Sequence, residues 1–217
     1  MSVTSLNNKD CIVRVDNVSK GYRNKKVLNE INFEIMEGQK VCLIGSNGAG
    51  KTTTLKILAG LLHPDSGAVL YGGKSLFDCP KSRKEIGYMT TELMFYEALS
   101  VEDNLALIGA LYGISSLNKR INQVIDIFHM ESFRSSLLSE ISSGMKRKFQ
   151  IAASIMHRPK LLILDEPFNT LDLETIEIVK KIIQENTVIF TTHDHRLARS
   201  IATNFLEIKN NKIEVLE

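Results

Sequence analysis

The chain is 217 residues long and carries 27 lysine and arginine residues against 25 aspartate and glutamate residues, for a formal net charge of +2. This near balance argues against a protein that coats nucleic acid, so no nucleic-acid partner is expected. The length favours a single domain over residues 1–217 with a sizeable buried core.

The first elements expected along the chain are β-strands. Apolar and polar residues alternate over residues 11–18 and 27–35, which is the period of half-buried strands, and residues 19–24 between them are typical of a turn. We expect these strands to pair in an antiparallel N-terminal β layer. Two more strands are expected at residues 68–71 and 85–89.

A glycine-rich loop lies between the apolar run at residues 40–44 and a helical pattern at residues 54–59. Its nine residues are Gly45, Ser46, Asn47, Gly48, Ala49, Gly50, Lys51, Thr52 and Thr53. The strand–loop–helix context is that of a phosphate-binding loop, in which glycines let backbone amides approach an anion at a helix N-terminus. We expect Lys51 to contact the β- and γ-phosphates of a nucleotide and the Thr52 hydroxyl to ligate Mg²⁺. The alternative is a glycine-rich turn with a solvated lysine.

Residues from about 92 to 157 show helical rather than strand periodicity. The run beginning at Ser100 resembles a capping box, and it is followed by apolar residues at helical spacing up to Tyr112. Two further helices are expected over residues 121–128 and 145–156. We therefore predict a helical subdomain inserted in the chain.

Buried-strand composition returns after the helical subdomain. Strands are expected at residues 161–165 and 187–191, with a helix over residues 173–184 between them, and at residues 202–208 and 212–216. Continuous apolar runs that alternate with helices indicate an α/β fold with a mixed, mainly parallel sheet. Three of its strands end in polar groups, and ligands of such sheets bind at the carboxyl ends of strands.

The polar groups at two of these strand ends are candidates for catalysis. Asp165 ends an apolar strand, where ligation of Mg²⁺ or a bond to Thr52 would offset the cost of a buried carboxylate. Glu166 follows and is the candidate general base for the water that attacks the γ-phosphate. His193 ends the next strand and could reach that phosphate. The alternatives are a pair of acids that cap a helix and a purely structural histidine.

The segment around Ser142, Ser143 and Gly144 precedes a helix whose first turn carries three positive charges. Cations are unfavourable at a helix N-terminus, because the helix dipole prefers anions there. An anion bound at these three residues would explain the pattern. The alternative is a solvated basic turn after an ordinary N-cap serine.

Taken in this order, the motifs resemble those of the nucleotide-binding subunit of ABC transporters. The resemblance implies a P-loop NTPase core, the cofactors ATP and Mg²⁺, and hydrolysis with Glu166 and His193 in the catalytic site. It also implies that Tyr22 stacks on adenine and that the signature at Ser142–Gly144 binds the γ-phosphate held by a second protomer, either the same chain or a homologous one. A groove in the helical subdomain would receive a membrane-spanning subunit, with Phe95, Tyr96 and Leu99 as candidate contacts.

Four positions depart from the family pattern. Thr91 stands where the family has glutamine, so it would reach Mg²⁺ through water. Ile141, Ser143 and Met145 replace the leucine, glycine and glutamine common in the signature. The resulting Ser-Ser-Gly-Met-Lys form resembles exporter ATPases with separately encoded membrane subunits, so export is the expected direction.

The expected location is the cytoplasmic face of a membrane, with attachment through the membrane subunit. The polar residues 1–9 lack the apolar stretch of a secretory signal, and three scattered cysteines indicate a reducing compartment. Two other functions are open at this point. One is a soluble ABC ATPase such as an iron–sulfur assembly-type ATPase, and the other is a regulatory ABC subunit that has lost hydrolysis.

Overall fold

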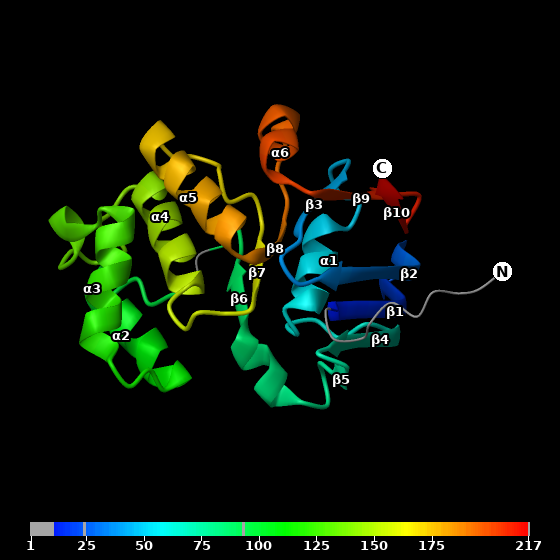
Figure 1. Cartoon of the computed structure of the whole chain (residues 1–217), viewed down its shortest axis with the longest axis horizontal. Coiled ribbons are helices and arrows are strands. Elements are labelled where there is room, and N and C mark those ends of the chain that lie inside the picture. Colours follow the sequence, from blue (N-terminus) through cyan, green and yellow to red (C-terminus); the bar gives the residue numbers. More distant parts are fainter. Residues whose placement is uncertain (1–10, 24, 93, 217) are drawn as a thin grey trace.

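The computed structural model describes residues 11–23, 25–92 and 94–216; the polar N-terminal stretch 1–9 lies outside these ranges. The N-terminal sheet is antiparallel, as predicted, with strand order β2-β1-β4-β5 (Figure 1). Its strands are β1 (Cys11–Tyr22), β2 (Lys25–Met36), β4 (Ser66–Tyr71) and β5 (Lys74–Ser75). The turn expected over residues 19–24 is shorter than predicted, because β1 continues to Tyr22, which pairs with Lys25.

The second sheet has the order β10-β9-β3-β8-β7-β6 and is mixed and mainly parallel, as predicted. The strands are β3 (Lys40–Gly45), β6 (Ile86–Met89), β7 (Leu161–Leu164), β8 (Thr187–Phe190), β9 (Asn204–Lys209) and β10 (Lys212–Leu216), of which β10 pairs antiparallel with β9. Strands β7 and β8 are buried at every residue, which explains their unbroken apolar composition.

Helix α1 (Lys51–Leu58) lies between the two sheets (Figure 1). Leu55 and Leu58 of this helix belong to one buried cluster that also contains Val15 from β1 and Leu43 from β3. Burial of apolar side chains on both sides of α1 therefore holds the glycine-rich loop, which directly precedes the helix, between the sheets.

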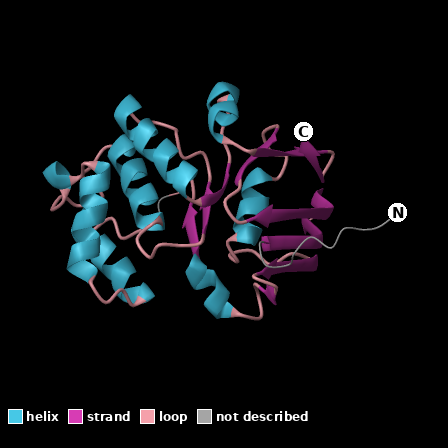
Figure 2. Ribbon diagram, in the orientation of Figure 1, coloured by secondary structure: helices cyan, strands magenta, loops and turns pink. Residues whose placement is uncertain are grey.

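The remaining helices lie on the other face of the second sheet (Figure 2). They are α2 (Val101–Tyr112), α3 (Leu117–Phe128), α4 (Ser143–Ser154), α5 (Leu173–Glu185) and α6 (His195–Ile201). Two short 3₁₀ turns complete the described elements: η1 (Pro80–Glu85), which leads into β6, and η2 (Glu131–Phe133). The predicted cap is confirmed, because the Ser100 side chain accepts a hydrogen bond from the Asp103 amide. Helix α4 begins and ends two residues earlier than expected.

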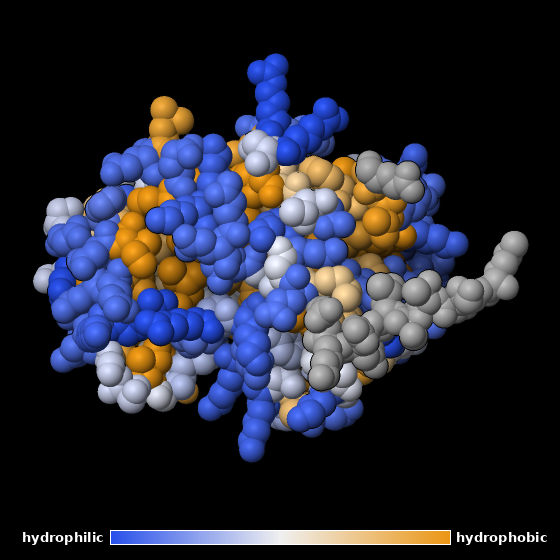
Figure 3. All heavy atoms as spheres, viewed as in Figure 1, coloured by the Kyte–Doolittle hydropathy of each residue, from blue (hydrophilic) through white to orange (hydrophobic). Residues whose placement is uncertain are grey.

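The surface drawn in Figure 3 is mostly hydrophilic, with apolar areas over the helical part and near the C-terminal strands. Among the described helices, none has the length and apolar character needed to cross a membrane.

Candidate functional site

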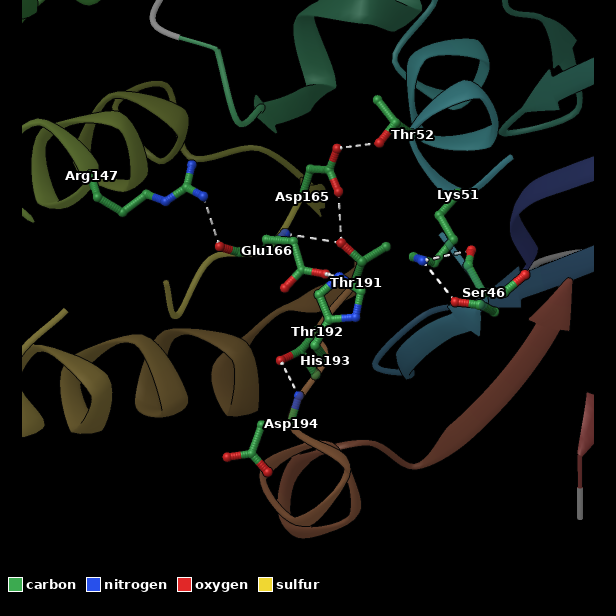
Figure 4. A network of polar contacts seen from close by, with 11 residues as sticks. Ser46, Lys51, Thr52, Arg147, Asp165, Glu166, Thr191, Thr192, His193 and Asp194 are labelled. Carbon is green, nitrogen blue, oxygen red and sulfur yellow. Dashed lines mark hydrogen bonds and ion pairs between the residues drawn. The ribbon is translucent and has the colours of Figure 1, made fainter. Parts of the chain in front are cut away.

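The ends of strands β3, β7 and β8 meet at one edge of the second sheet (Figure 4). Side chains from these ends line a cavity of about 300 Å³. The lining residues are Val27, Asn47, Gly48, Gly50, Lys51, Thr52, Thr53, Thr91, Asp165, Glu166 and His193. The expectation that three strand ends form one site is therefore confirmed.

Gly50 makes the turn from the loop into α1. Its φ angle of 112° is in a region that residues with side chains rarely adopt, and a Cβ there would lie 2.9 Å from Cγ1 of Val27. Helix α1 begins at the next residue, so its first amides and the positive end of its dipole open into the cavity. The loop is thus built to hold an anion.

Lys51 lies over the loop that precedes it. Its Nζ donates hydrogen bonds to the backbone carbonyls of Gly45, at 2.7 Å, and Ser46, at 3.2 Å (Figure 4). An anion that bonded the loop amides would therefore lie within reach of the Lys51 ammonium.

Asp165 is 2% exposed, and each of its carboxylate oxygens accepts a hydrogen bond. The Thr52 hydroxyl donates to Oδ2 at 2.8 Å, as the sequence predicts, and the Thr191 hydroxyl donates to Oδ1 at 2.7 Å. A carboxylate has about four lone-pair sites, so these bonds leave room for a further ligand. Carboxylate and hydroxyl oxygens are hard donors of the kind that Mg²⁺ prefers, and the set at Thr52 and Asp165 fits this ion.

Glu166 has a left-handed backbone, with φ of +52°, and is 7% exposed. Its amide donates to Oγ1 of Thr191 at 2.9 Å, while neither carboxylate oxygen accepts a hydrogen bond of ordinary geometry from the described residues. Nε2 of His193 lies 3.3 Å from Oε1, within ion-pair distance. Burial raises the pKa of Glu166 above its ordinary value, more than His193 lowers it. A buried carboxylate of raised pKa is a suitable proton acceptor.

Thr191 donates a hydrogen bond to the carboxylate of Asp165, and Arg147 donates one to the backbone of Glu166; the sequence revealed neither role. The sequence predicts Arg147 only as one of three positive charges in the first turn of a helix, with a solvated basic turn as the alternative. Arg147 is not solvated, since it is 7% exposed and donates from Nη2 to the carbonyl of Glu166 at 2.9 Å. It lies on the face of α4 that packs inward, and the helix period places Gln150, also buried, one turn further on. This helical spacing was the signal in the sequence that could have indicated the burial of Arg147.

The signature residues Ser142, Ser143 and Gly144 lie at the start of α4. The Ser142 side chain caps the helix by accepting a hydrogen bond from the Met145 amide, at 3.2 Å. None of the three lines the phosphate-loop cavity; Ser143 instead borders a second cavity of about 400 Å³. That second cavity is lined by Thr91, Ser143, Lys146, Arg147, Gln150, Asn169 and Thr170. Within one chain, the signature and the phosphate loop thus face different spaces.

Tyr22 and Thr91 occupy different positions relative to the phosphate loop. Tyr22 ends β1, is 48% exposed and is absent from the cavity lining, where Val27 of the next strand stands instead. Adenine stacking by Tyr22 stays a prediction. Thr91 follows β6, is exposed and borders both cavities, next to Asp165 in one and Ser143 in the other.

A groove of about 300 Å³ runs between the second sheet and the helical part. Its lining is mainly apolar and aromatic: Ala59, Leu61, Arg83, Ile86, Tyr88, Met94, Phe95, Ile108, Tyr112, Ala153, Ser154 and His157. Phe95 lies in the groove, as expected, whereas Tyr96 and Leu99 lie outside its lining. Phe95 turns inward because its ring packs edge-on against Phe149 of α4, with centroids 4.9 Å apart.

Comparison of the sequence with known proteins gives one consistent family. The family model described as ABC transporter matches residues 28–169. An uncharacterised ABC transporter ATP-binding protein of Methanocaldococcus jannaschii is 35% identical, over 92% of this chain and 75% of its own length. The probable sulfate/thiosulfate import ATP-binding protein CysA of Chlorella vulgaris is 31% identical, over 93% of this chain and 89% of its own.

Two solved structures share the fold over nearly the whole chain. The ATP-binding subunit of an ABC transporter has a TM-score of 0.88 at 31% identity, covering 94% of this chain and 90% of that one. A dimeric ATP-binding cassette in a post-hydrolysis state with ADP and Pi has a TM-score of 0.86 at 25% identity, covering 95% of this chain and 99% of that one.

Proposed function

The chain belongs to the ABC transporter family as an ABC ATPase domain, and from this premise we propose that it binds and hydrolyses ATP to power a membrane-spanning subunit. We propose one ATPase domain over residues 1–217, with residues from about 92 to 157 as its helical subdomain. The observation that carries the proposal is the shared cavity of Lys51, the Thr52–Asp165 pair and the Glu166–His193 pair.

Each group in the cavity has a proposed role that follows from its contacts. The loop from Gly45 to Thr53 binds the phosphates through its amides and the Lys51 ammonium. Thr52 and Asp165 hold Mg²⁺, with Thr91 reaching it through water; when bound, this ion neutralises charge on the β- and γ-phosphates. The assignment of Thr52 and Asp165 is supported by their hydroxyl and carboxylate oxygens, which lie within hydrogen-bond distance of each other and are of the kind that Mg²⁺ prefers as ligands.

The catalytic step is proposed for Glu166 and His193. Glu166 accepts the proton of the attacking water, a role supported by its burial and raised pKa. His193 is proposed to contact the γ-phosphate, and it lies close enough to Glu166 to hold that side chain in place. Tyr22 is proposed to stack on the adenine ring at the exposed end of β1.

A second protomer, identical or homologous, is part of the proposed mechanism. Ser143, at the start of α4, borders a cavity other than the phosphate-loop cavity, and we propose that Ser142, Ser143 and Gly144 bind the γ-phosphate held by the partner chain. The helix dipole at this end favours such an anion. The dimeric state of the cassette with ADP and Pi supports the presence of a second protomer.

Gly144→Ala tests the signature role. A Cβ at Gly144 would lie 2.8 Å from the carbonyl oxygen of Thr170, which is closer than real Cβ contacts. The backbone must therefore shift at the proposed interface while the phosphate loop stays intact. We expect a loss of ATP hydrolysis of about 10- to 100-fold, the scale of a small misplacement of catalytic groups, with ATP affinity of the monomer nearly unchanged. Equal loss of monomer affinity, measured by calorimetry, would contradict the assignment.

The membrane partner is proposed to dock in the groove between the sheet and the helical subdomain. An amphipathic helix fits an apolar groove of this kind, and Met94 and Phe95 at its edge lie close in sequence to Thr91 of the phosphate cavity. The protein would then sit on the cytoplasmic face of the membrane. Export is the proposed direction, because the Ser-Ser-Gly-Met-Lys form of the signature resembles that of exporter ATPases.

The test is affinity capture from mildly solubilised membranes, with tagged Glu166→Gln protein in ATP and Mg²⁺. We expect a polytopic membrane protein to co-purify. Met94→Glu in the same background should lose this partner, because it places a charge in the groove at a side chain that is 62% exposed. Leu111→Glu is the matched control, since Leu111 is 70% exposed and outside the groove lining. Capture of soluble proteins alone would instead favour a non-transport ABC ATPase.

The direction of transport can be measured with the captured complex. Reconstituted in vesicles with the ATPase outside, an exporter accumulates its substrate in the lumen when ATP is added. Movement of substrate out of the lumen would instead assign import, the function in the printed name of the CysA relative.

A further inference from the structure

Arg147 of α4 is a buried cation whose contacts are mostly backbone carbonyls. Its Nη1 donates to the carbonyl of Thr90 at 3.1 Å and to the side chain of Gln150 at 3.4 Å. Its Nη2 donates to the carbonyl of Glu166 at 2.9 Å, the bond drawn in Figure 4. It makes no ion pair with a carboxylate of the described residues. A guanidinium suits this position because its planar fork can bond several oxygens at once.

The carbonyl held by Arg147 belongs to a residue with an unusual backbone. Glu166 has a positive φ, which for a residue other than glycine persists when surrounding contacts hold it. Its amide is held by Thr191, at the end of β8, and its carbonyl by Arg147. The two bonds hold the backbone on both sides of Glu166 and so fix the direction in which its side chain leaves the backbone.

The same helix also holds the segment that follows β6. Thr90 is bonded by Arg147 and by Nε2 of Gln150, at 3.3 Å, and the carbonyl of Glu92 accepts from Gln150 at 2.8 Å. Thr91 lies between these two residues and borders the phosphate cavity. Through Arg147, the helix that begins with the signature thus contacts both Glu166 and the segment that carries Thr91.

We propose that Arg147 is a positioning residue that links the signature helix to Glu166 and sets the orientation of its carboxylate toward the water that attacks the γ-phosphate. Arg147 acts through the backbone of Glu166 and the carbonyl of Thr90. This inference rests on the function proposed for Glu166. It predicts a defect in the chemical step rather than in nucleotide binding.

Arg147→Met removes the hydrogen bonds while keeping much of the side-chain volume. We expect kcat for ATP hydrolysis to fall about 10- to 100-fold, as for other small misplacements of a catalytic group, with the dissociation constant for ATP nearly unchanged. Arg147→Lys can bond one of the carbonyls and is expected to restore part of the rate. If Arg147→Met does not fold, as judged by circular dichroism, Arg147→Lys decides, and a wild-type kcat for it overturns the proposal.

Arg120→Met is the matched control for loss of a structural arginine. Arg120 also donates to backbone carbonyls, those of Met156 at 2.9 Å and Ile155 at 2.5 Å, but it lies outside the lining of both site cavities. The Arg120→Met variant should have a lower melting temperature and the same kcat as the wild-type protein. An equal fall in kcat for both variants would show that Arg147 supports the fold in general, and would overturn the proposal.

A second readout separates positioning of Glu166 from formation of the dimer. In the Glu166→Gln background, Arg147→Met should still form the ATP-dependent dimer on size-exclusion chromatography, because ATP binding and the signature are left intact. Loss of that dimer would overturn the proposal by assigning Arg147 to the signature instead. If the single variant Glu166→Gln hydrolysed ATP at the normal rate, the function proposed for Glu166 would be contradicted, which is a result distinct from a failure of the Arg147 inference.

Discussion

Glu166→Gln is expected to lower the rate of ATP hydrolysis by about 10²- to 10⁴-fold, the usual contribution of a general base. Glutamine has nearly the shape of glutamate but cannot accept the proton of the attacking water. ATP should still bind, because the phosphate loop and the Thr52–Asp165 pair are untouched. The nucleotide then remains uncleaved, and we expect a dimer that is stable in ATP and Mg²⁺.

Single-turnover hydrolysis and size-exclusion chromatography measure the two effects of Glu166→Gln. Glu214→Gln, in the exposed part of β10, is the control for loss of an acidic side chain, and it should behave as wild type. A Glu166→Gln variant that hydrolyses ATP at the wild-type rate would mean that another group accepts the proton.

The pH profile gives an independent check on Glu166. The base must be ionised, and burial raises its pKa above the ordinary value of 4.5. As the pH falls through this raised pKa, the carboxylate is protonated and hydrolysis is lost, so the acidic limb of the rate profile should lie above pH 4.5. The limb should disappear from the residual activity of Glu166→Gln.

Lys51→Ala is expected to weaken ATP binding strongly. A hydrogen bond to a charged group contributes about 1.5–3 kcal/mol, so loss of the ammonium should raise the dissociation constant about 10- to 150-fold. The fold should persist, because Lys51 bonds the carbonyls of its own loop and is not part of either apolar core cluster. Calorimetric titration with ATP measures the effect.

Lys56→Ala is the matched control for Lys51→Ala. Lys56 lies in the last turn of the same helix, outside the lining of the phosphate-loop cavity. Its loss should leave ATP affinity unchanged. If Lys51→Ala bound ATP as tightly as Lys56→Ala, the loop would lose its proposed role as the phosphate site.

Local patterns predicted the helices and strands because the formation of these elements depends on residues that are close in the sequence. The alternation in β1 and β2, the unbroken apolar runs of β7 and β8, and the glycine spacing before α1 each reflect contacts within a few residues. The convergence of Asp165 and His193 with the loop followed from a general rule about parallel sheets.

Side chains that act across elements were harder to predict. The sequence did not distinguish Arg147 from the two lysines beside it, because its burial depends on how α4 packs against the loop at Thr90 and against Glu166. Val27 lines the phosphate cavity because β2 runs past Gly50. Neither contact has a sequence spacing that could reveal it.

Glycine spacing, strand-end acids and apolar periodicity are local properties of the chain, so they predicted the phosphate loop, the carboxylate pair and the main strands and helices, though not β5. Packing between elements sets which oxygens meet at Asp165, holds the left-handed backbone of Glu166 next to Arg147, and places Ser143 at a cavity other than the phosphate-loop cavity. These features depend on packing between segments that are far apart in the sequence, and such packing does not produce a regular spacing of residue types from which it could be predicted.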